Sequence, residues 1–193
     1  MAQLKEGVIF PTNFYIADLF DEQQNQKYKN FLIELSRRKK GERRSNRNGW
    51  QSDTFLWREE IFKSLLDQIL NSTQVIARNL SNKESPQMVI RAMWGNINPK
   101  GGFNFTHIHP SGWMSGVYYV QLPENNNEIV FQDPRSARMM DFQRSSLIKD
   151  EYFSHYPKVG ELLLFPSWLP HFVSPNTSDQ NRISISFNVE IVV

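Results

Sequence analysis

The sequence predicts a mainly β fold flanked by helices, with the helices in the N-terminal third of the chain. Residues 22–80 hold two stretches with the apolar spacing of amphipathic helices, whereas from Gln87 onward short runs rich in β-branched and aromatic residues are separated by turn signals. The chain also contains 14 Phe, 6 Tyr and 5 Trp, side chains that pack well between sheets. Several short strands preceded by two helices indicate a β-barrel or sandwich with helices on one face.

The N-terminal third is expected to contain a short strand and two helices. The strand is predicted at Val8 to Ile16. Asp21 followed by Gln24 resembles a capping box, so a helix should run from about Glu22 to Arg38. A second amphipathic helix is expected from about Arg58 to Leu80. The apolar faces of the two helices consist of Tyr28, Phe31, Leu32 and Leu35, and of Ile61, Phe62, Leu65, Leu66, Ile69, Leu70 and Ile76.

The residues from Arg37 to Arg44 form a basic run with one glycine, and a polar loop at 45–49 follows it. Such a run binds phosphates or nucleic acid in some proteins. In others it is the solvated end of a helix, whose cations complement the helix dipole. We favour the solvated helix end because no aromatic residues are interleaved with the basic ones. Nucleic acid is therefore not an expected partner.

The second half of the chain switches to the pattern of strands. Turn residues at 123–127 separate two of these strands. The predicted strands are 87–98, 115–121, 128–131, 160–165, 170–173 and 182–193.

Length and composition limit the class of protein. We expect residues 1–193 to form a single domain, with a helical support segment at 1–85 and a β core at 86–193. The net charge of +2 is mild, and the absence of cysteine excludes disulfides, iron–sulfur clusters and thiol nucleophiles. The N-terminus has no apolar run of signal-peptide length, and no stretch approaches the roughly 18 apolar residues of a membrane span. A cytoplasmic location without membrane association is expected.

Three of the four histidines have the spacing of metal ligands. His107 and His109 are two residues apart, and on an extended strand such residues project to the same side. His171, from a distant strand, would complete the site. Imidazole binds iron, zinc, copper and nickel, and three ligands on one side of a metal leave positions open for substrate and dioxygen. A His-x-His pair alone also occurs in ordinary core and surface positions. We interpret His155, in a polar stretch, as a loop residue without a metal role.

The order of motifs around these histidines resembles the 2-oxoglutarate- and Fe(II)-dependent oxygenases, a branch of the superfamily with a double-stranded β-helix (jelly-roll, cupin-like) core. The resemblance covers the C-terminal two-thirds in detail, and Trp50-Gln51-Ser52 extends it into the first third. The motifs are Trp94-Gly95-Asn96, His107-Ile108-His109-Pro110, Ser115-Gly116-Val117-Tyr118-Tyr119, Gly160 to His171, and Arg182 to Asn188.

The resemblance implies a role for each motif. It makes His107, His109 and His171 the ligands of Fe(II), and it implies that 2-oxoglutarate chelates the metal through its 2-oxo acid end. The other carboxylate of 2-oxoglutarate would bind Arg182, because a guanidinium offers a planar fork to a carboxylate. Ser184 is on the same strand face and can add a hydroxyl donor. Tyr119 either lines this pocket or is a core aromatic. The alternatives for Arg182 and Ser184 are a surface ion pair and an ordinary strand hydroxyl.

One position departs from the superfamily pattern. The usual metal site has two histidines and one carboxylate, but His109 stands where the carboxylate is usual. Asp133 is the nearest candidate for a substitute carboxylate ligand. We favour a turn or cap before Pro134 as its role.

The implied reaction is the oxidative decarboxylation of 2-oxoglutarate to succinate and CO2, coupled to hydroxylation of a substrate C–H bond by dioxygen. The substrate is either a small molecule or a macromolecular side chain. Loops at 100–102 and 136–156, the second with Met139 and Met140, would form the rim of its site.

Two other functions remain open from the sequence. A three-histidine, cupin-like dioxygenase or isomerase would keep the metal without using 2-oxoglutarate, because His109 replaces the carboxylate. A non-catalytic binding module would use the basic run from Arg37 to Arg44 to hold a partner.

Overall fold

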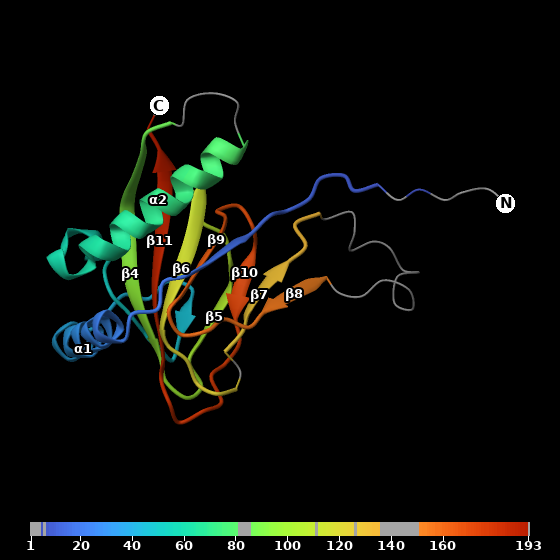
Figure 1. Cartoon of the computed structure of the whole chain (residues 1–193). Helices are drawn as coiled ribbons and strands as arrows, with labels where there is room; N and C mark the ends of the chain where they lie inside the picture. The colour runs from blue at the N-terminus through green and yellow to red at the C-terminus, as the bar shows by residue number, and fades with distance from the viewer. Residues whose placement is uncertain are drawn as a thin grey trace.

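A computed structural model describes residues 5, 7–80, 86–110, 112–125, 127–135 and 151–192 of the chain. Two antiparallel sheets face each other, and the two long helices lie against the outer face of one of them (Figure 1). The sequence prediction of a mainly β fold with helices in the N-terminal third is confirmed.

The helices begin and end close to the predicted residues. Helix α1 spans Glu22–Arg38, and Asp21 caps it by accepting a hydrogen bond from the backbone N–H of Gln24. The second predicted helix is shorter than expected: two 3-10 turns, η1 (Leu56–Arg58) and η2 (Glu60–Phe62), precede α2 (Lys63–Leu80). In the described part of the chain, no helix is long and apolar enough to span a membrane.

The strands form a six-stranded and a five-stranded sheet. The first has the order β1-β9-β6-β11-β4-β3, and the second has the order β2-β5-β10-β7-β8. The strands are β1 (Tyr15–Asp18), β2 (Asn46–Arg47), β3 (Trp50–Gln51), β4 (Met88–Asn98), β5 (Phe103–His107), β6 (Met114–Gln121), β7 (Ile129–Gln132), β8 (Tyr152–His155), β9 (Glu161–Pro166), β10 (His171–Val173) and β11 (Arg182–Ile191).

Two apolar layers hold these elements together. The larger layer lies between the helices and the six-stranded sheet, and Leu32 of α1 is fully buried in it. A methyl group at Gly95 of β4 would overlap the Leu32 side chain, so the glycine allows the helix to approach the sheet closely. The smaller layer lies between the two sheets and includes Tyr119 and Phe131.

Strand β11 separates these layers by the alternation of its side chains. It pairs with β4 on one side and β6 on the other, at the centre of the six-stranded sheet. Ile183, Ile185 and Phe187 belong to the layer under the helices, as predicted. The alternate residues of β11 face the space between the two sheets and line a cavity there. These residues are Arg182, Ser184, Ser186 and Asn188.

The prediction of a strand at Val8 to Ile16 is wrong over most of its length. Val8, Ile9 and Phe10 are 76–82% exposed, and pairing begins only at Tyr15, where β1 meets β9. An apolar run predicts a strand, but the run becomes part of a sheet only where its backbone can form hydrogen bonds with a neighbouring strand. Strands β2, β3 and β8 were not predicted, because segments of two to four polar-rich residues carry no measurable alternation.

We predict that Leu32→Ala lowers the free energy of unfolding by about 2–5 kcal/mol, because the truncation leaves a cavity between α1 and the sheet. Urea unfolding followed by circular dichroism measures this change. Leu80→Ala is the matched control, since Leu80 is 61% exposed at the end of α2 and should change stability by less than about 0.5 kcal/mol. Equal effects of the two substitutions would contradict this packing of α1.

Candidate metal centre

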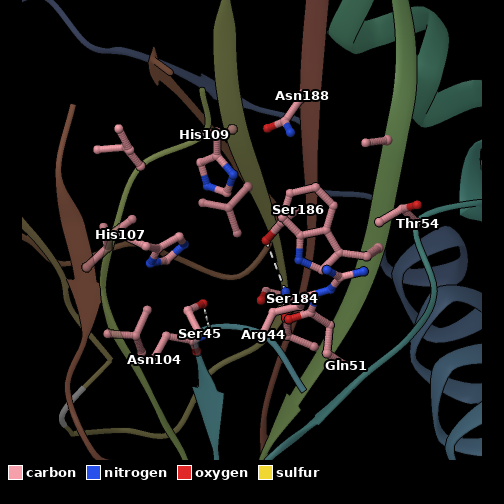
Figure 2. Close-up of a pocket in the computed structure, with 18 of the residues that line it drawn as sticks. Arg44, Ser45, Gln51, Thr54, Asn104, His107, His109, Ser184, Ser186 and Asn188 are labelled. Carbon is pink, nitrogen blue, oxygen red and sulfur yellow. Dashed lines mark hydrogen bonds between the residues drawn. The ribbon is translucent and has the colours of Figure 1, made fainter. Parts of the chain in front are cut away.

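A cavity of about 460 Å³ opens between the two sheets. Residues from β4, β6 and β11 form one wall, and residues from β5 and β10 contribute to the other. Figure 2 shows His107 and His109 on one side of this cavity and Ser184, Ser186 and Asn188 of β11 on the other. The cavity therefore holds both the histidine motif and the polar face of β11.

Sheet register brings two of the three histidines together. His107 ends β5, and His171 begins β10, where the two residues are direct cross-strand partners. His109 lies beyond the end of β5 rather than on the same strand, in contrast to the prediction. Its backbone N–H donates to the carbonyl of Ser167 at 2.9 Å, which turns the segment after β5 back over the cavity.

The three imidazole rings form a compact group. The ring centroids are 4.4 Å apart for His107 and His171, 4.9 Å for His107 and His109, and 5.2 Å for His109 and His171. One nitrogen from each ring lies within 4.8 Å of the other two, so the three could hold one metal ion. The predicted convergence of these residues is therefore observed in the structure.

Backbone carbonyls orient two of the rings. Nδ1 of His107 lies 2.7 Å from the carbonyl oxygen of Phe105, and Nδ1 of His171 lies 2.9 Å from that of Leu169. A carbonyl oxygen can only accept, so each Nδ1 carries the proton and each Nε2 keeps a lone pair. This is the arrangement that metal-bound histidines adopt, with the non-ligating nitrogen held by a hydrogen bond. The donor set therefore fits a metal ion.

Packing and a hydroxyl network support His109. Its ring packs against Trp94, with the centroids 5.6 Å apart. Ser167, whose carbonyl accepts from the His109 backbone, shares a 2.7 Å hydroxyl hydrogen bond with Ser115. Ser115 in turn donates to Asn188 Oδ1 at 2.8 Å. These contacts tie the segment carrying His109 to β6 and β11.

Burial keeps the imidazoles uncharged. It lowers the pKa of His109 to about 4, with a further contribution from the neighbouring His107. Burial, followed by the charges of His107 and His109, lowers the pKa of His171 to about 3. The pKa of His107 is also lowered by burial. At neutral pH all three rings are in the neutral form that coordinates metals.

The residues predicted to hold the cosubstrate line the same cavity. Arg182 is 4% exposed and donates through Nη1 to the carbonyl of Glu128 at 3.0 Å. Its guanidinium lies 5.7 Å from the ring centre of Tyr119, a fully buried residue whose hydroxyl has no hydrogen-bond partner of good geometry. Ser184 is the cross-strand partner of Tyr119 on β6 and of Asn96 on β4. Arg182 is therefore a buried cation rather than half of a surface ion pair.

A family comparison matches residues 92–188, half of the chain, to a model described as "Putative 2OG-Fe(II) oxygenase". The chain belongs to this oxygenase family. The matched segment runs from β4 to β11 and includes all three histidines and Arg182. The expectations of an enzyme of this class and of Fe(II), 2-oxoglutarate and dioxygen as its metal, cosubstrate and oxidant are confirmed at the level of the family. A comparison with curated proteins finds no match.

Solved structures show the same fold. HygX from Streptomyces hygroscopicus, with nickel, 2-oxoglutarate and hygromycin B bound, matches with a TM-score of 0.69 and 10% identity over 94% of this chain and 84% of its own. A Pseudomonas putida prolyl-4-hydroxylase matches with a TM-score of 0.66 and 13% identity over 94% of both chains. The viral collagen prolyl hydroxylase of Paramecium Bursaria Chlorella virus-1 matches at 0.62 and 13% identity, over 93% of this chain and 96% of its own. The predicted double-stranded β-helix core is confirmed.

Asp133 does not join the histidine group of the oxygenase. Both of its carboxylate oxygens face Arg135, at 2.9 and 2.8 Å, and its backbone N–H donates to Glu151. It lines a second cavity, outside the one that holds the histidines. His155 is on strand β8 rather than in the predicted loop, and its Nε2 contacts Glu161.

The predicted rim of the oxygenase site is wrong in its described part. Residues 100–102 and 151–156 do not line the histidine cavity, and Met139 and Met140 lie outside the described residues. The segments around Arg44, Thr54 and Ile108 line it instead. One sequence pattern could have identified some of the lining residues that were not predicted. Trp94, Asn96 and Asn98 alternate along β4 with apolar positions, so their side chains share one face of the strand. The missed lining residues that can form hydrogen bonds are Arg44, Ser45, Gln51, Thr54, Trp94, Asn96, Asn98, Asn104, Ser186 and Asn188.

We predict that the metal-free oxygenase loses stability as the pH falls from about 7 to 4. His109 and His171 have folded-state pKa values of about 4 and 3, below the ordinary 6.5. Between these limits the unfolded chain binds protons that the folded chain does not, so the free energy of unfolding decreases. Urea unfolding at a series of pH values tests this.

The variant His171→Asn removes one of the three histidines whose pKa is lowered and should show a shallower decrease over the same pH range. A slope identical to that of the unchanged protein would contradict the role assigned to the buried imidazoles.

Proposed function

We propose that this oxygenase hydroxylates a substrate C–H bond, with His107, His109 and His171 holding Fe(II) and Arg182 binding the distal carboxylate of 2-oxoglutarate. The observation that carries the proposal is the convergence of three imidazoles, two of which, His107 and His109, line the cavity that also holds the buried guanidinium of Arg182. The overall reaction would consume dioxygen and 2-oxoglutarate and release succinate and CO2.

The imidazoles supply the metal's protein ligands. Three neutral rings would bind the ion and leave further positions for ligands in the cavity. When bound, Fe(II) supplies the one-electron and dioxygen chemistry that no side chain can perform. The chain's own contribution is to hold the rings in one orientation through Phe105 and Leu169 and to exclude bulk water with Trp94 and Phe165.

A buried cation without an ion pair supports the cosubstrate role of Arg182. Removing a guanidinium from water is costly unless a counter-charge compensates it. In the described residues, Arg182 forms no salt bridge: it donates to the Glu128 carbonyl and lies beside Tyr119, and the Glu128 carboxylate attracts it only from beyond ion-pair distance. A dicarboxylate that reaches from the metal to Arg182 would supply this charge, and Ser184 could donate a hydroxyl hydrogen bond to the same group. Tyr119 would then form the wall beside the cosubstrate.

The substrate reacting at this site would be a small molecule or a side chain of a macromolecule. Among the solved neighbours, HygX holds hygromycin B, and others are prolyl hydroxylases. We also propose that the helical segment at 1–85 and the β core at 86–193 act as one unit. The close approach of Leu32 to Gly95 supports this.

We predict that anaerobic addition of 2-oxoglutarate to the Fe(II)-loaded protein produces a weak visible charge-transfer band. His171→Ala should abolish the band because it removes a metal ligand. Arg182→Ala should raise the 2-oxoglutarate concentration needed for half-maximal absorbance by tenfold or more, since it removes a charge-assisted pair worth about 1.5–3 kcal/mol.

Two matched controls separate these roles from general damage. His155→Ala removes a histidine outside the group, and Arg135→Ala removes an arginine that pairs with Asp133 at the second cavity. Both should leave the band unchanged. Iron binding without any band in the unchanged protein would instead favour a three-histidine metalloenzyme that does not use 2-oxoglutarate.

A further inference from the structure

The charged side chains that line the histidine cavity are all cationic. Among the described lining residues, Arg182 and Arg44 are the only ones with a formal charge at neutral pH, and no carboxylate is present. The remaining polar lining consists of amides and hydroxyls. A metal held by three neutral imidazoles lacks the negative charge that a carboxylate ligand would bring. The cavity is therefore more positive than a site with two histidines and one carboxylate.

Arg44 lines this cavity from the segment between α1 and β2, and its side chain is 66% exposed. Its backbone N–H donates to Asn46 Oδ1 at 2.8 Å, and the neighbouring Glu42 N–H donates to the carbonyl of Gln51 at 2.8 Å. Figure 2 shows Arg44 together with Ser45 and Gln51 among the lining residues. The sequence predicted a solvated basic run after the helix, and Arg44 is indeed exposed, but the structure also places it in the lining of the cavity, which the sequence did not predict.

Glu42 orients the guanidinium of Arg44 but does not use all of its N–H donors. Its Nε and Nη2 both donate to a single oxygen of Glu42, at 3.0 and 2.8 Å. Nη1 makes no hydrogen bond to any described residue. Residues 37–47 contain seven Lys and Arg side chains and one carboxylate, that of Glu42. The pairing with Glu42 therefore leaves Nη1 of Arg44 able to donate to an anion in the cavity.

Other basic residues of this run are engaged elsewhere. Arg47 donates to the carbonyls of Arg44 and Asn46 and stacks on Phe105 at 4.7 Å. Lys39 pairs with Asp53, and Arg38 pairs with Glu34. Of the cations in this run, Arg44 alone lines the cavity among the described residues. The geometry favours recognition of one anionic group at Arg44 over an extended contact with a polyanion.

A buried amide indicates a second contact inside the cavity. Asn96 is 7% exposed and donates through Nδ2 to Ser186 Oγ at 3.0 Å. Its Oδ1 is also buried and has no hydrogen-bond partner among the described residues. A buried acceptor without a partner is costly, so a ligand that donates a hydrogen bond there would relieve the cost.

We propose that the molecule hydroxylated by this enzyme is a small organic acid, whose carboxylate or phosphate binds Arg44 and whose hydroxyl or N–H donates to Asn96. The inference rests on the proposed function and names the substrate class of the same site. The cavity of about 460 Å³ is near the lower end of the range for small-molecule sites, and it must also hold the metal and 2-oxoglutarate. The remaining space suits a compact molecule.

The test measures where small acids bind, without turnover. The protein is loaded with Mn(II) and saturating 2-oxoglutarate, and the proton signals of added probes are recorded by NMR. A probe bound near the metal is broadened by Mn(II) but not by Zn(II). The probes are N-acetylglycine with its neutral match N-acetylglycinamide, and glycerol 3-phosphate with glycerol. The two acids distinguish carboxylate from phosphate recognition.

At least one acid should be broadened more strongly than its neutral match, and Arg44→Gln should weaken its binding by about tenfold. Arg43→Gln is the matched control. It removes the same charge from the adjacent position, which is exposed as Arg44 is but does not line the cavity, and it should change binding by less than about twofold. Arg44→Lys should restore part of the affinity.

The inference is overturned if acids and neutral matches behave alike, if no probe is broadened, or if Arg43→Gln and Arg44→Gln weaken binding equally. The proposed function fails separately, if the unchanged protein does not bind 2-oxoglutarate. Loss of 2-oxoglutarate binding in Arg44→Gln would place Arg44 in the cosubstrate site, which would overturn the inference and leave the proposed function intact. In that case the charge-transfer titration would show the loss directly.

Discussion

The alternation of side chains along β11, held in register by its two neighbours, is the constraint on which the rest of the structure depends. Its odd-numbered residues from Ile183 to Phe187 complete the layer under the helices, and its even-numbered residues from Arg182 to Asn188 line the cavity. A slip of one residue would place a guanidinium in the apolar layer and isoleucines in the cavity. Because both exchanges are costly, packing of the helices also fixes the polar surface of the site.

The second sheet places His107 and His171 opposite this polar surface. Its central feature is the pairing of His171 with His107, which joins residues distant in the sequence. His109 is added by a turn of the chain after β5, held by Ser167 rather than by sheet pairing. Sheet pairing therefore positions His107 and His171, whereas the position of His109 depends on the hydrogen bonds that link Ser167 to Ser115 and Asn188.

Periodicity was sufficient to predict the elements that bury a long apolar face. Helix α1 and strand β11 were predicted with boundaries close to those observed, because each has enough residues to show its period. The spacing of the histidines also indicated which of these rings would meet, and the family resemblance indicated that Arg182 would line the same cavity. The family resemblance supplied their chemical roles.

The features that the sequence did not predict depend on contacts between segments distant in the chain. Nothing local distinguishes Val8 to Phe10, which stay exposed, from a strand, because pairing depends on a distant edge. His109 was placed on an extended strand, but β5 ends two residues earlier. The polar residues of 44–51 have no period, and only the hairpin-like return through β2 and β3 brings Arg44 to the cavity. Asp133 lines a different cavity, where it pairs with Arg135, and spacing alone does not reveal this.

The carbonyls that orient His107 and His171 belong to Phe105 and Leu169, in each case two residues before the histidine. Substitution of a side chain cannot delete a peptide carbonyl. The orientation of these two rings is therefore insulated from changes in the surrounding side chains, including Phe105 itself, which is half exposed. Such a histidine group can keep its geometry while mutation reshapes the walls around it, so that the scaffold can vary its cavity without rebuilding the group.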